Sequence, residues 1–296
     1  MSWLLYLVGP VTVLYVSHFI FQRCLVANRR RLNQGDLIDE ASKAFASLVE
    51  GINANLPNAV VIHEDVACIA WSATNVPTLN AAFRVSQATT VSQLEDSLAY
   101  VQNQFSRLDN GGGGTFIFAA SALFDKGVSP ETLRKVSLNY GFQAGFNPIM
   151  AREGGLFEKI DLGDLVIKKI ERAEQIDQLF TLMFHQDSSD WSYSVQFFKS
   201  LHSYMGFVDG KFVTSATAHS YNGKVFLSGV GTLPEHRNRG YGTAISKYAL
   251  QKALEQSGSN ISLLNSSEMG KPIYERMGFK MIGTAVISRY ESSRLI

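Results

Sequence analysis

The chain is poor in the residues on which several classes of protein depend. Its 296 residues include two cysteines, Cys24 and Cys68, which lie far apart and form no CxxC motif. We therefore expect neither a disulfide framework nor a zinc site, and no metal. Acidic and basic residues nearly cancel, leaving a net charge of +1, and there is no long basic run. No strong field attracts nucleic acid, so we expect no nucleic-acid partner.

Charged side chains are also missing from residues 3–21, WLLYLVGPVTVLYVSHFIF, where His18 is the only side chain that can carry a charge near neutral pH. A helix of about 20 apolar residues crosses a bilayer core. Four arginines follow the run, so the positive-inside rule places the rest of the chain in the cytoplasm. We predict membrane association through 3–21, within an N-terminal segment 1–35. A buried first helix and an incorrectly assigned start codon are the alternatives.

Residues 36–160 have the pattern of an α/β domain. Ser129 and Pro130 predict the start of a helix, because serine is a good N-cap and proline suits the first helical position. The glycine-rich stretch 109–114 reads as a flexible loop, and the charged stretch 151–163 marks a domain boundary. Hydrophobic spacing predicts helices at 37–56 and 91–108 and strands at 59–62, 67–72, 81–85 and 115–120.

Residues 161–296 are predicted to form a second domain with a mostly antiparallel sheet. Asp209-Gly210 and Asn222-Gly223 are strong hairpin-turn signals that join three successive strands. The whole chain is therefore expected to be of the α/β (α+β) class, with a mixed sheet flanked by helices. Strands are predicted at 164–169, 204–208, 211–220, 224–232, 261–264 and 279–287, and helices at 175–185, 192–202, 241–256 and 272–277.

The loop after the third hairpin strand has the composition of an anion site. It reads Arg237-Asn238-Arg239-Gly240-Tyr241-Gly242 and opens a helix, whose first amide groups and dipole attract negative charge. Glycines let a phosphate approach the backbone, and the arginines add charge. The third glycine of a dinucleotide fingerprint is replaced by Ile245, and no GK[ST] follows. The sequence predicts a pyrophosphate site, with an ordinary surface turn as the alternative.

Two segments resemble motifs of the GNAT acetyltransferase superfamily. Arg237, Gly240 and Gly242 match the [RQ]-x-x-G-x-[GA] pattern of its motif A. Residues 267–279, SEMGKPIYERMGF, are similar to the family's late Y-x-x-x-G-F segment, here Tyr274 to Phe279. The resemblance covers about 164–290 and implies a GNAT-like C-terminal domain.

The resemblance implies an N-acetyltransferase that moves an acetyl or other acyl group from acetyl-CoA, its co-substrate, to a primary amine by direct attack. The co-substrate would bind where the domain's fourth strand separates from its fifth. An N–H near Val230 or Gly231 would stabilise the oxyanion, and Tyr274 would be the general acid. The expected cofactor-binding residues are Val230, Thr232, Arg237, Arg239, Gly240, Tyr241, Gly242, Thr243 and Ala244.

The sequence leaves the base and the acceptor open. Candidates for the base are His185, Asp187, Asp190 and His219, each of which is more often structural or solvated, and a water relay is the alternative. Trp191 would add an aromatic wall. The acceptor is expected to be a small-molecule or peptide amine, with protein lysine also open. The alternative function is a non-catalytic acyl-CoA-binding or membrane-tethered regulatory module with a GNAT fold.

The N-terminal half carries no comparable phosphate loop. Residues 75–80, NVPTLN, weakly resemble a V-P-x-x-x-N element of two-part GNAT proteins, whose first halves are often degenerate copies of the fold. We hypothesise that this half walls the acceptor cleft of a cytoplasmic-facing catalytic domain. An unrelated α/β domain is the alternative.

Overall fold

The computed structural model describes residues 33–72, 79–84, 90–109, 115–121, 128–184 and 191–291. Leu37–Ile296 form one compact unit. The apolar run 3–21 lies outside the described residues. Within the described ranges, no helix is both long enough and apolar enough to cross a bilayer.

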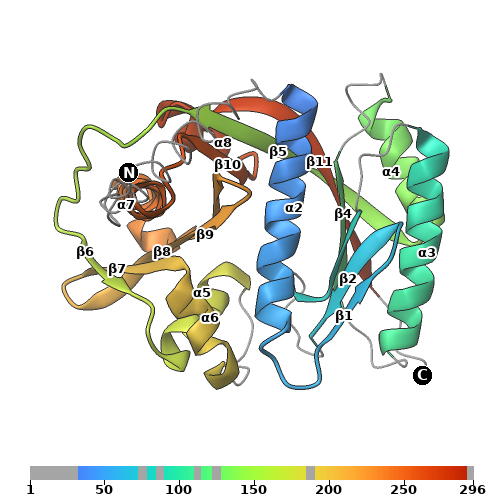
Figure 1. Ribbon diagram of the computed structural model, residues 1–296, viewed down its shortest axis with the longest axis horizontal. Helices are drawn as coiled ribbons and strands as arrows, with labels where there is room; N and C mark the ends of the chain where they lie inside the picture. The colour runs from blue at the N-terminus through green and yellow to red at the C-terminus, as the bar shows by residue number, and fades with distance from the viewer. Residues whose placement is uncertain are drawn as a thin grey trace, which may run out of the picture. The chain divides into compact units, whose positions relative to one another are not determined.

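One mixed sheet organises the described part of the chain, in the order β1-β2-β3-β4-β11-β5-β10-β9-β8-β7-β6 (Figure 1). Most neighbours are antiparallel; β3 and β4 are parallel, and so are β9 and β10. The strands are β1 (Val60–His63), β2 (Ala67–Trp71), β3 (Ala81–Arg84), β4 (Thr115–Ser121), β5 (Phe142–Glu153), β6 (Val166–Lys169), β7 (His202–Val208), β8 (Lys211–Tyr221), β9 (Lys224–Thr232), β10 (Ile261–Asn265) and β11 (Lys280–Glu291).

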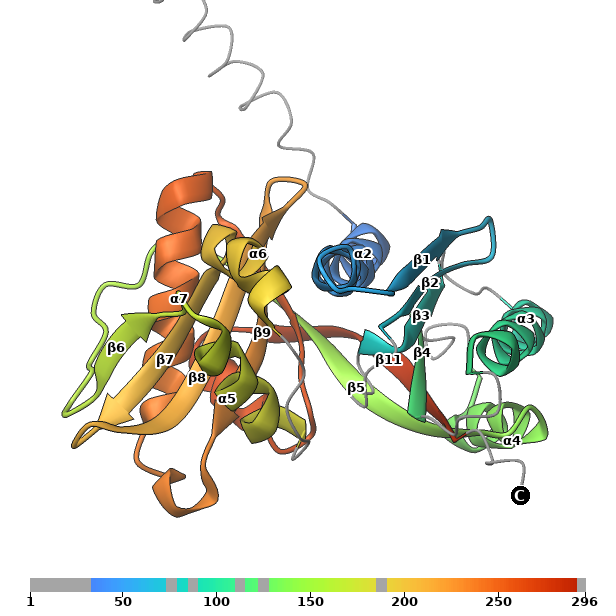
Figure 2. The ribbon, with the colours of Figure 1, turned by 90° about the horizontal axis from the view of Figure 1, so that it is seen from below.

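Helices cover this sheet, which confirms the predicted fold class. Figure 2 shows α2 in the middle, with α5 and α6 on one side of it and α3 and α4 beyond β1–β3 on the other. The helices are α2 (Gln34–Asn53), α3 (Val91–Asp109), α4 (Pro130–Asn139), α5 (Ala173–Phe184), α6 (Val195–Ser200), α7 (Tyr241–Ser257) and α8 (Lys271–Arg276), with 3-10 turns η3 (Ser192–Ser194) and η4 (Pro234–His236).

Local sequence signals explain several of these boundaries. Asp209 and Gly210 both have positive φ, 49° and 76°, as do Asn222 and Gly223 at 46° and 71°. Positive φ at both central residues is the geometry of a type I′ hairpin turn, which suits the twist of the strands on either side. Ser129 Oγ accepts a hydrogen bond from the Thr132 N–H at 3.1 Å and so caps α4 as predicted.

The long strands β5 and β11 join the two predicted halves of the chain. β11 pairs with β4 on one side and with β5 on the other, and β5 also pairs with β10. The first residues of the predicted boundary 151–163 therefore belong to a strand, because β5 continues to Glu153. The division into 36–160 and 161–296 stays a prediction about the organisation of the sequence.

Helix α2 is bound to the C-terminal part of the sheet by specific contacts. His219 hydrogen-bonds through Nε2 with the Ala44 carbonyl at 3.0 Å, which places a proton on Nε2 because a carbonyl only accepts. Lys224 Nζ lies 3.3 Å from Glu40 Oε2, and the Phe45 ring is stacked 6.1 Å from Phe226. A helix from the first half therefore covers β8 and β9.

Candidate active site

Strands β9 and β10 separate partway along their length. Their parallel pairing joins Ser262–Leu264 to Val225–Leu227 and goes no further. β9 is buried up to Leu227 and half-buried from Ser228 onward. This is the separation of fourth and fifth strands that the sequence resemblance implies.

A bulge in β9 lies at the same point. Ser228 is opposite Thr217 on β8, whereas Gly231 is opposite Ser215, so β9 carries one residue more than its partner. Gly229 takes a φ of +58°, which side-chain-bearing residues rarely adopt. Because a bulge takes backbone groups out of the ladder, it can turn an N–H toward the space between the strands.

A cavity of about 720 Å³, which we call the β9–β10 cleft, occupies this separation. The end of β9, the glycine loop and α8 form its walls. It contains the predicted residues Val230, Thr232, Arg237, Gly240, Tyr241, Gly242, Thr243 and Tyr274. The two other predicted residues, Arg239 and Ala244, line an adjoining cavity of about 350 Å³ that also includes Lys247.

The N-terminus of α7 opens into the β9–β10 cleft. Gly240 caps the helix with a φ of +85°, and its carbonyl accepts the first intrahelical hydrogen bond, from the Ala244 N–H at 2.9 Å. The three amides before it, of Tyr241, Gly242 and Thr243, have no acceptor within their own helix. These amides and the helix dipole favour an anion.

Basic side chains add to this positive end. Arg237, Arg276 and His236 line the β9–β10 cleft, and no acidic residue is among its described lining residues. Arg237 Nε donates to the Thr232 carbonyl at 3.1 Å, which holds the guanidinium beside the end of β9. The arrangement fits a phosphate-bearing ligand.

Tyr274 presents a buried phenol on the wall of the same cleft. Its side chain is 9% exposed and packs against Phe279, with ring centroids 6.0 Å apart. Burial raises the pKa of Tyr274 to about 12, so the phenol keeps its proton at neutral pH. Among the described residues, none hydrogen-bonds to its hydroxyl, which is available to a ligand.

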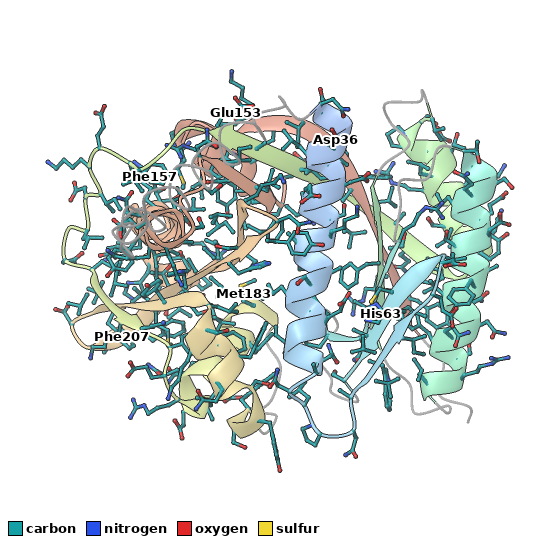
Figure 3. The ribbon with its side chains drawn as sticks, in the orientation of Figure 1. Asp36, His63, Glu153, Phe157, Met183 and Phe207 are labelled. Carbon is teal, nitrogen blue, oxygen red and sulfur yellow. The ribbon has the colours of Figure 1, made fainter. Side chains whose placement is uncertain are left out.

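A third cavity, of about 310 Å³, lies beyond the strand separation, and we call it the apolar chamber. It is lined by α2, α5, α6 and the sheet. The apolar chamber and the β9–β10 cleft share Met183, Leu227, Ser228, Gly229 and Asn265, so the two spaces meet where β9 leaves β10. Figure 3 shows Met183 near the end of α5, on the side toward α2.

The predicted base candidates do not gather at this junction. His185, Asp187 and Asp190 lie outside the described residues. His219 lines neither cavity, and burial lowers its pKa to about 4, so it is a neutral residue that binds α2. Trp191 is not among the lining residues of the chamber, but it stacks on Phe180, which is, with ring centroids 4.3 Å apart. Its Nε1 donates a hydrogen bond to Asp177 at 3.3 Å.

The structure adds residues that the sequence did not indicate. Ser228, Asn265, Arg276 and the inner face of α2 all line the two spaces. Asn265 ends the apolar run of β10 and is followed by two serines, a change of polarity that could have marked the end of strand pairing. The position of α2 had no local signal.

A separate cluster has the chemistry of a metal site. Glu50, His63 and Cys68 place one ligand atom each within 4.8 Å of the others, and His63 is opposite Cys68 across the β1–β2 pair. Zinc takes all three ligand types. However, the Cys68 thiol donates to Glu50 Oε1 at 2.9 Å, and burial raises its pKa. The Cys68 thiol and the Glu50 carboxylate are thus already paired with each other. The expectation of no metal stays a prediction.

The fold and the family match agree on a GNAT-like architecture. Residues 170–279 match the Acetyltransferase (GNAT) family, so the chain contains a GNAT acetyltransferase domain. No curated protein is a significant sequence match to the chain.

Solved structures extend the similarity beyond this domain. A GCN5-related N-acetyltransferase from Kribbella flavida superposes with a TM-score of 0.58 at 18% identity, covering 84% of this chain and 95% of that one. One from Sphaerobacter thermophilus gives 0.52 at 14%, covering 80% and 77%. A tandem GNAT protein from the clavulanic acid biosynthesis pathway gives 0.52 at 13%, covering 90% and 97%. At these identities the similarity shows the fold alone.

Proposed function

We propose that the protein is an N-acyltransferase that moves the acetyl group of acetyl-CoA to a primary amine by direct attack. One observation carries this proposal: a bulged strand, a free helix N-terminus and a buried phenol line a single cleft at the separation of β9 from β10. The GNAT family match supports the same reaction class.

The binding roles follow from the positions of the residues. The amides of Tyr241, Gly242 and Thr243 would hold the pyrophosphate, with Arg237 beside them and Arg239 adding charge from the adjoining cavity. The backbone of Val230 and Thr232 would pair with the pantetheine as an added strand does. Ala244 would contribute only to the wall, since its N–H is already bonded to Gly240.

The chemical roles divide between the β9 bulge and α8. The thioester supplies an activated carbonyl, and the N–H of Val230 or Gly231 would stabilise the negative charge that develops on its oxygen. Tyr274 would donate a hydrogen bond to the departing thiolate. A phenol with a pKa of about 12 is a weaker acid than a thiol, so Tyr274 does not give up its proton for good. The proton that the leaving thiolate finally gains comes instead from the attacking nitrogen, which loses one as the amide forms.

We propose that residues 36–160 are a degenerate GNAT-like half whose helix α2 walls the acceptor site. The structural neighbours cover 80–90% of this chain and include a protein named as a tandem GNAT, which supports this reading. The contacts of α2 with β8 and β9 place it against the apolar chamber. A membrane tether at 3–21 rests on the apolar run and its flanking arginines alone, and stays a prediction.

Calorimetric titration of acetyl-CoA into the full chain tests the proposal. The informative pair of variants is Gly240→Trp and Gly258→Trp, at opposite ends of α7. Both glycines have positive φ, +85° and +66°, and a Cβ added at either would meet no atom within 4 Å, so the two changes strain the backbone alike. Only Gly240 lines the β9–β10 cleft.

We expect micromolar-range binding to be retained in Gly258→Trp and weakened at least tenfold in Gly240→Trp. Absence of acetyl-CoA binding by the folded wild-type protein would refute the proposal. Binding without acetyl transfer to any primary amine would favour the alternative, a non-catalytic acyl-CoA-binding module.

A further inference from the structure

The described lining of the apolar chamber contains no charged side chain. Its polar residues are Asn147, Thr217, Ser228 and Asn265, all uncharged, and the rest of its described lining is apolar apart from Gly229. Its volume of about 310 Å³ is at the lower end of small-molecule sites. No carboxylate is available in this lining to pair with an ammonium group, and no cation to pair with a carboxylate.

Three hydrogen-bonding atoms on this wall have no partner. Thr217 Oγ1, Ser228 Oγ and Asn265 Oδ1 are buried and make no hydrogen bond to any described residue. Buried polar atoms are nearly always paired in folded proteins, and each exception needs an explanation. A ligand with hydrogen-bonding groups at this point of the cavity would give such atoms partners.

The position of these atoms relates them to the transfer reaction. Ser228 and Asn265 also line the β9–β10 cleft, at the place where the two spaces meet. Thr217 lies directly opposite Ser228 across the β8–β9 pair. A nitrogen held by this group would therefore lie between the apolar chamber and the β9 bulge.

We propose that the apolar chamber binds the acceptor as an uncharged primary amine carried on an apolar aryl or alkyl body, without a carboxylate or second charge. The inference rests on the proposed function and deepens it. The amine's two N–H groups are donated to Asn265 Oδ1 and Ser228 Oγ, which leaves the nitrogen lone pair free. An ammonium ion in this apolar space would be unpaired, and a charge buried without a partner is strongly disfavoured.

The chemistry of the lining argues against a long acyl chain as the occupant. A hydrocarbon would satisfy the apolar wall but would leave Thr217, Ser228 and Asn265 without partners. An amine on an apolar body would contact the apolar wall and give Ser228 and Asn265 hydrogen-bond partners. We therefore assign the chamber to the acceptor and the junction to the short acetyl group.

Fluorine NMR titration of the full chain, without acetyl-CoA, tests this assignment separately from catalysis. The two probes are 2-(4-fluorophenyl)ethylamine and 4-fluoro-L-phenylalanine at pH 9, which differ by one carboxylate. We expect the amine to bind at least tenfold more tightly than the amino acid. Equal or reversed affinities would overturn the inference.

Variants locate the binding within the chain. Asn265→Leu removes the unpaired oxygen, and Asn260→Leu is its control, because Asn260 is exposed and immediately precedes the same strand. Val49→Phe fills the apolar chamber from α2 without touching the cleft lining. We expect at least tenfold weaker amine binding in Asn265→Leu and Val49→Phe and no change in Asn260→Leu.

The same variants separate this inference from the proposed function. Acetyl-CoA affinity should be unchanged in Val49→Phe, because Val49 lies outside the β9–β10 cleft. Amine binding with no acetyl-CoA binding would sustain the assignment of the apolar chamber to an amine while refuting the transferase. Acetyl-CoA binding without amine binding, or tighter binding of octanoyl-CoA than acetyl-CoA that Val49→Phe abolishes, would overturn the acceptor assignment alone.

Discussion

Protonation of His219 should destabilise the docking of α2, and the structure gives the size of the effect. The imidazole is 7% exposed, packs against Phe226 at 5.6 Å and bonds through Nε2 to the Ala44 carbonyl. Its Nδ1 is buried and has no partner among the described residues. A charged imidazole would thus bury an N–H with no acceptor, and this burial lowers the pKa from 6.5 to about 4.

The sign of the pH dependence follows from the two pKa values. The unfolded chain takes up a proton as the pH falls through 6.5, whereas the folded chain does so only near 4. The stabilisation is therefore complete above 6.5 and is lost as the pH falls toward 4. At 1.36 kcal/mol for each pKa unit, the full loss is roughly 3 kcal/mol, of which about 2 kcal/mol falls between pH 7.5 and 5.0.

Urea unfolding of the wild type and of His219→Gln at pH 7.5 and 5.0 measures this effect. Glutamine keeps an N–H that can reach the Ala44 carbonyl but does not titrate. Other titratable groups contribute equally to the pH dependence of both proteins and cancel in the comparison. One of them is His202, whose pKa is lowered mainly by burial. The wild type should lose about 2 kcal/mol more than the variant over this range. Equal losses in the two proteins would show that His219 is not a buried neutral residue and would refute the reasoning.

Two further predictions concern the phenol and the ion pair. Tyr274→Phe should lower kcat for acetyl transfer about 100-fold with acetyl-CoA affinity unchanged, because it removes only the hydroxyl. Tyr204 is the control, because burial also raises the pKa of its phenol to about 12, yet it lines neither the β9–β10 cleft nor the apolar chamber. Tyr204→Phe should therefore keep wild-type kinetics. A comparable loss in both variants would remove the catalytic role. A double-mutant cycle of Glu40→Gln and Lys224→Met, followed by urea unfolding, should give a coupling energy of about 1–3 kcal/mol, since both side chains are less than one-fifth exposed. A coupling near zero would show that this pair does not hold α2.

Much of the fold was predictable because its signals are local. The turn residues Asp209-Gly210 and Asn222-Gly223 fix two hairpins, and the serine–proline start of α4 needs no distant partner. The glycine loop is local in the same sense, since it consists of the end of one strand and the first turn of the next helix. Its place on the cleft could therefore be anticipated from consecutive residues.

The extent of β5 could not be predicted because its end looks like a loop. Arg152 and Glu153 are charged, yet they pair with Ser262 and Ile261 of β10. The Arg152 guanidinium lies 4.1 Å from the Phe157 ring centre and donates to the carbonyls of Gly154 and Gly155. Contacts with residues after the strand thus stabilise the Arg152 charge at the end of β5. In the sequence alone, the same charge indicated a domain boundary.

The proposed acceptor side of the site could be recognised only from tertiary structure. Ser228 continues the strand pattern of β9, and Asn265 ends that of β10. Their significance appears only when the two strands are seen to separate between them. Likewise, Phe45, Leu48 and Val49 read as an ordinary apolar helix face. That face has two uses, because part of it packs in the core and part lines the apolar chamber.

The two cavities of the site are built from different parts of the chain. The β9–β10 cleft is built almost wholly from 227–276, within the GNAT domain, whereas the apolar chamber takes one wall from α2. The contacts that hold α2 involve Glu40, Ala44 and Phe45 and none of the glycine-loop residues. Substitutions on the inner face of α2 are therefore expected to change the shape of the apolar chamber while the amides at the start of α7 keep their geometry. If the chain acts as we propose, α2 would contribute to the shape of the acceptor site, whereas the residues proposed to bind the acyl donor all lie within 170–279.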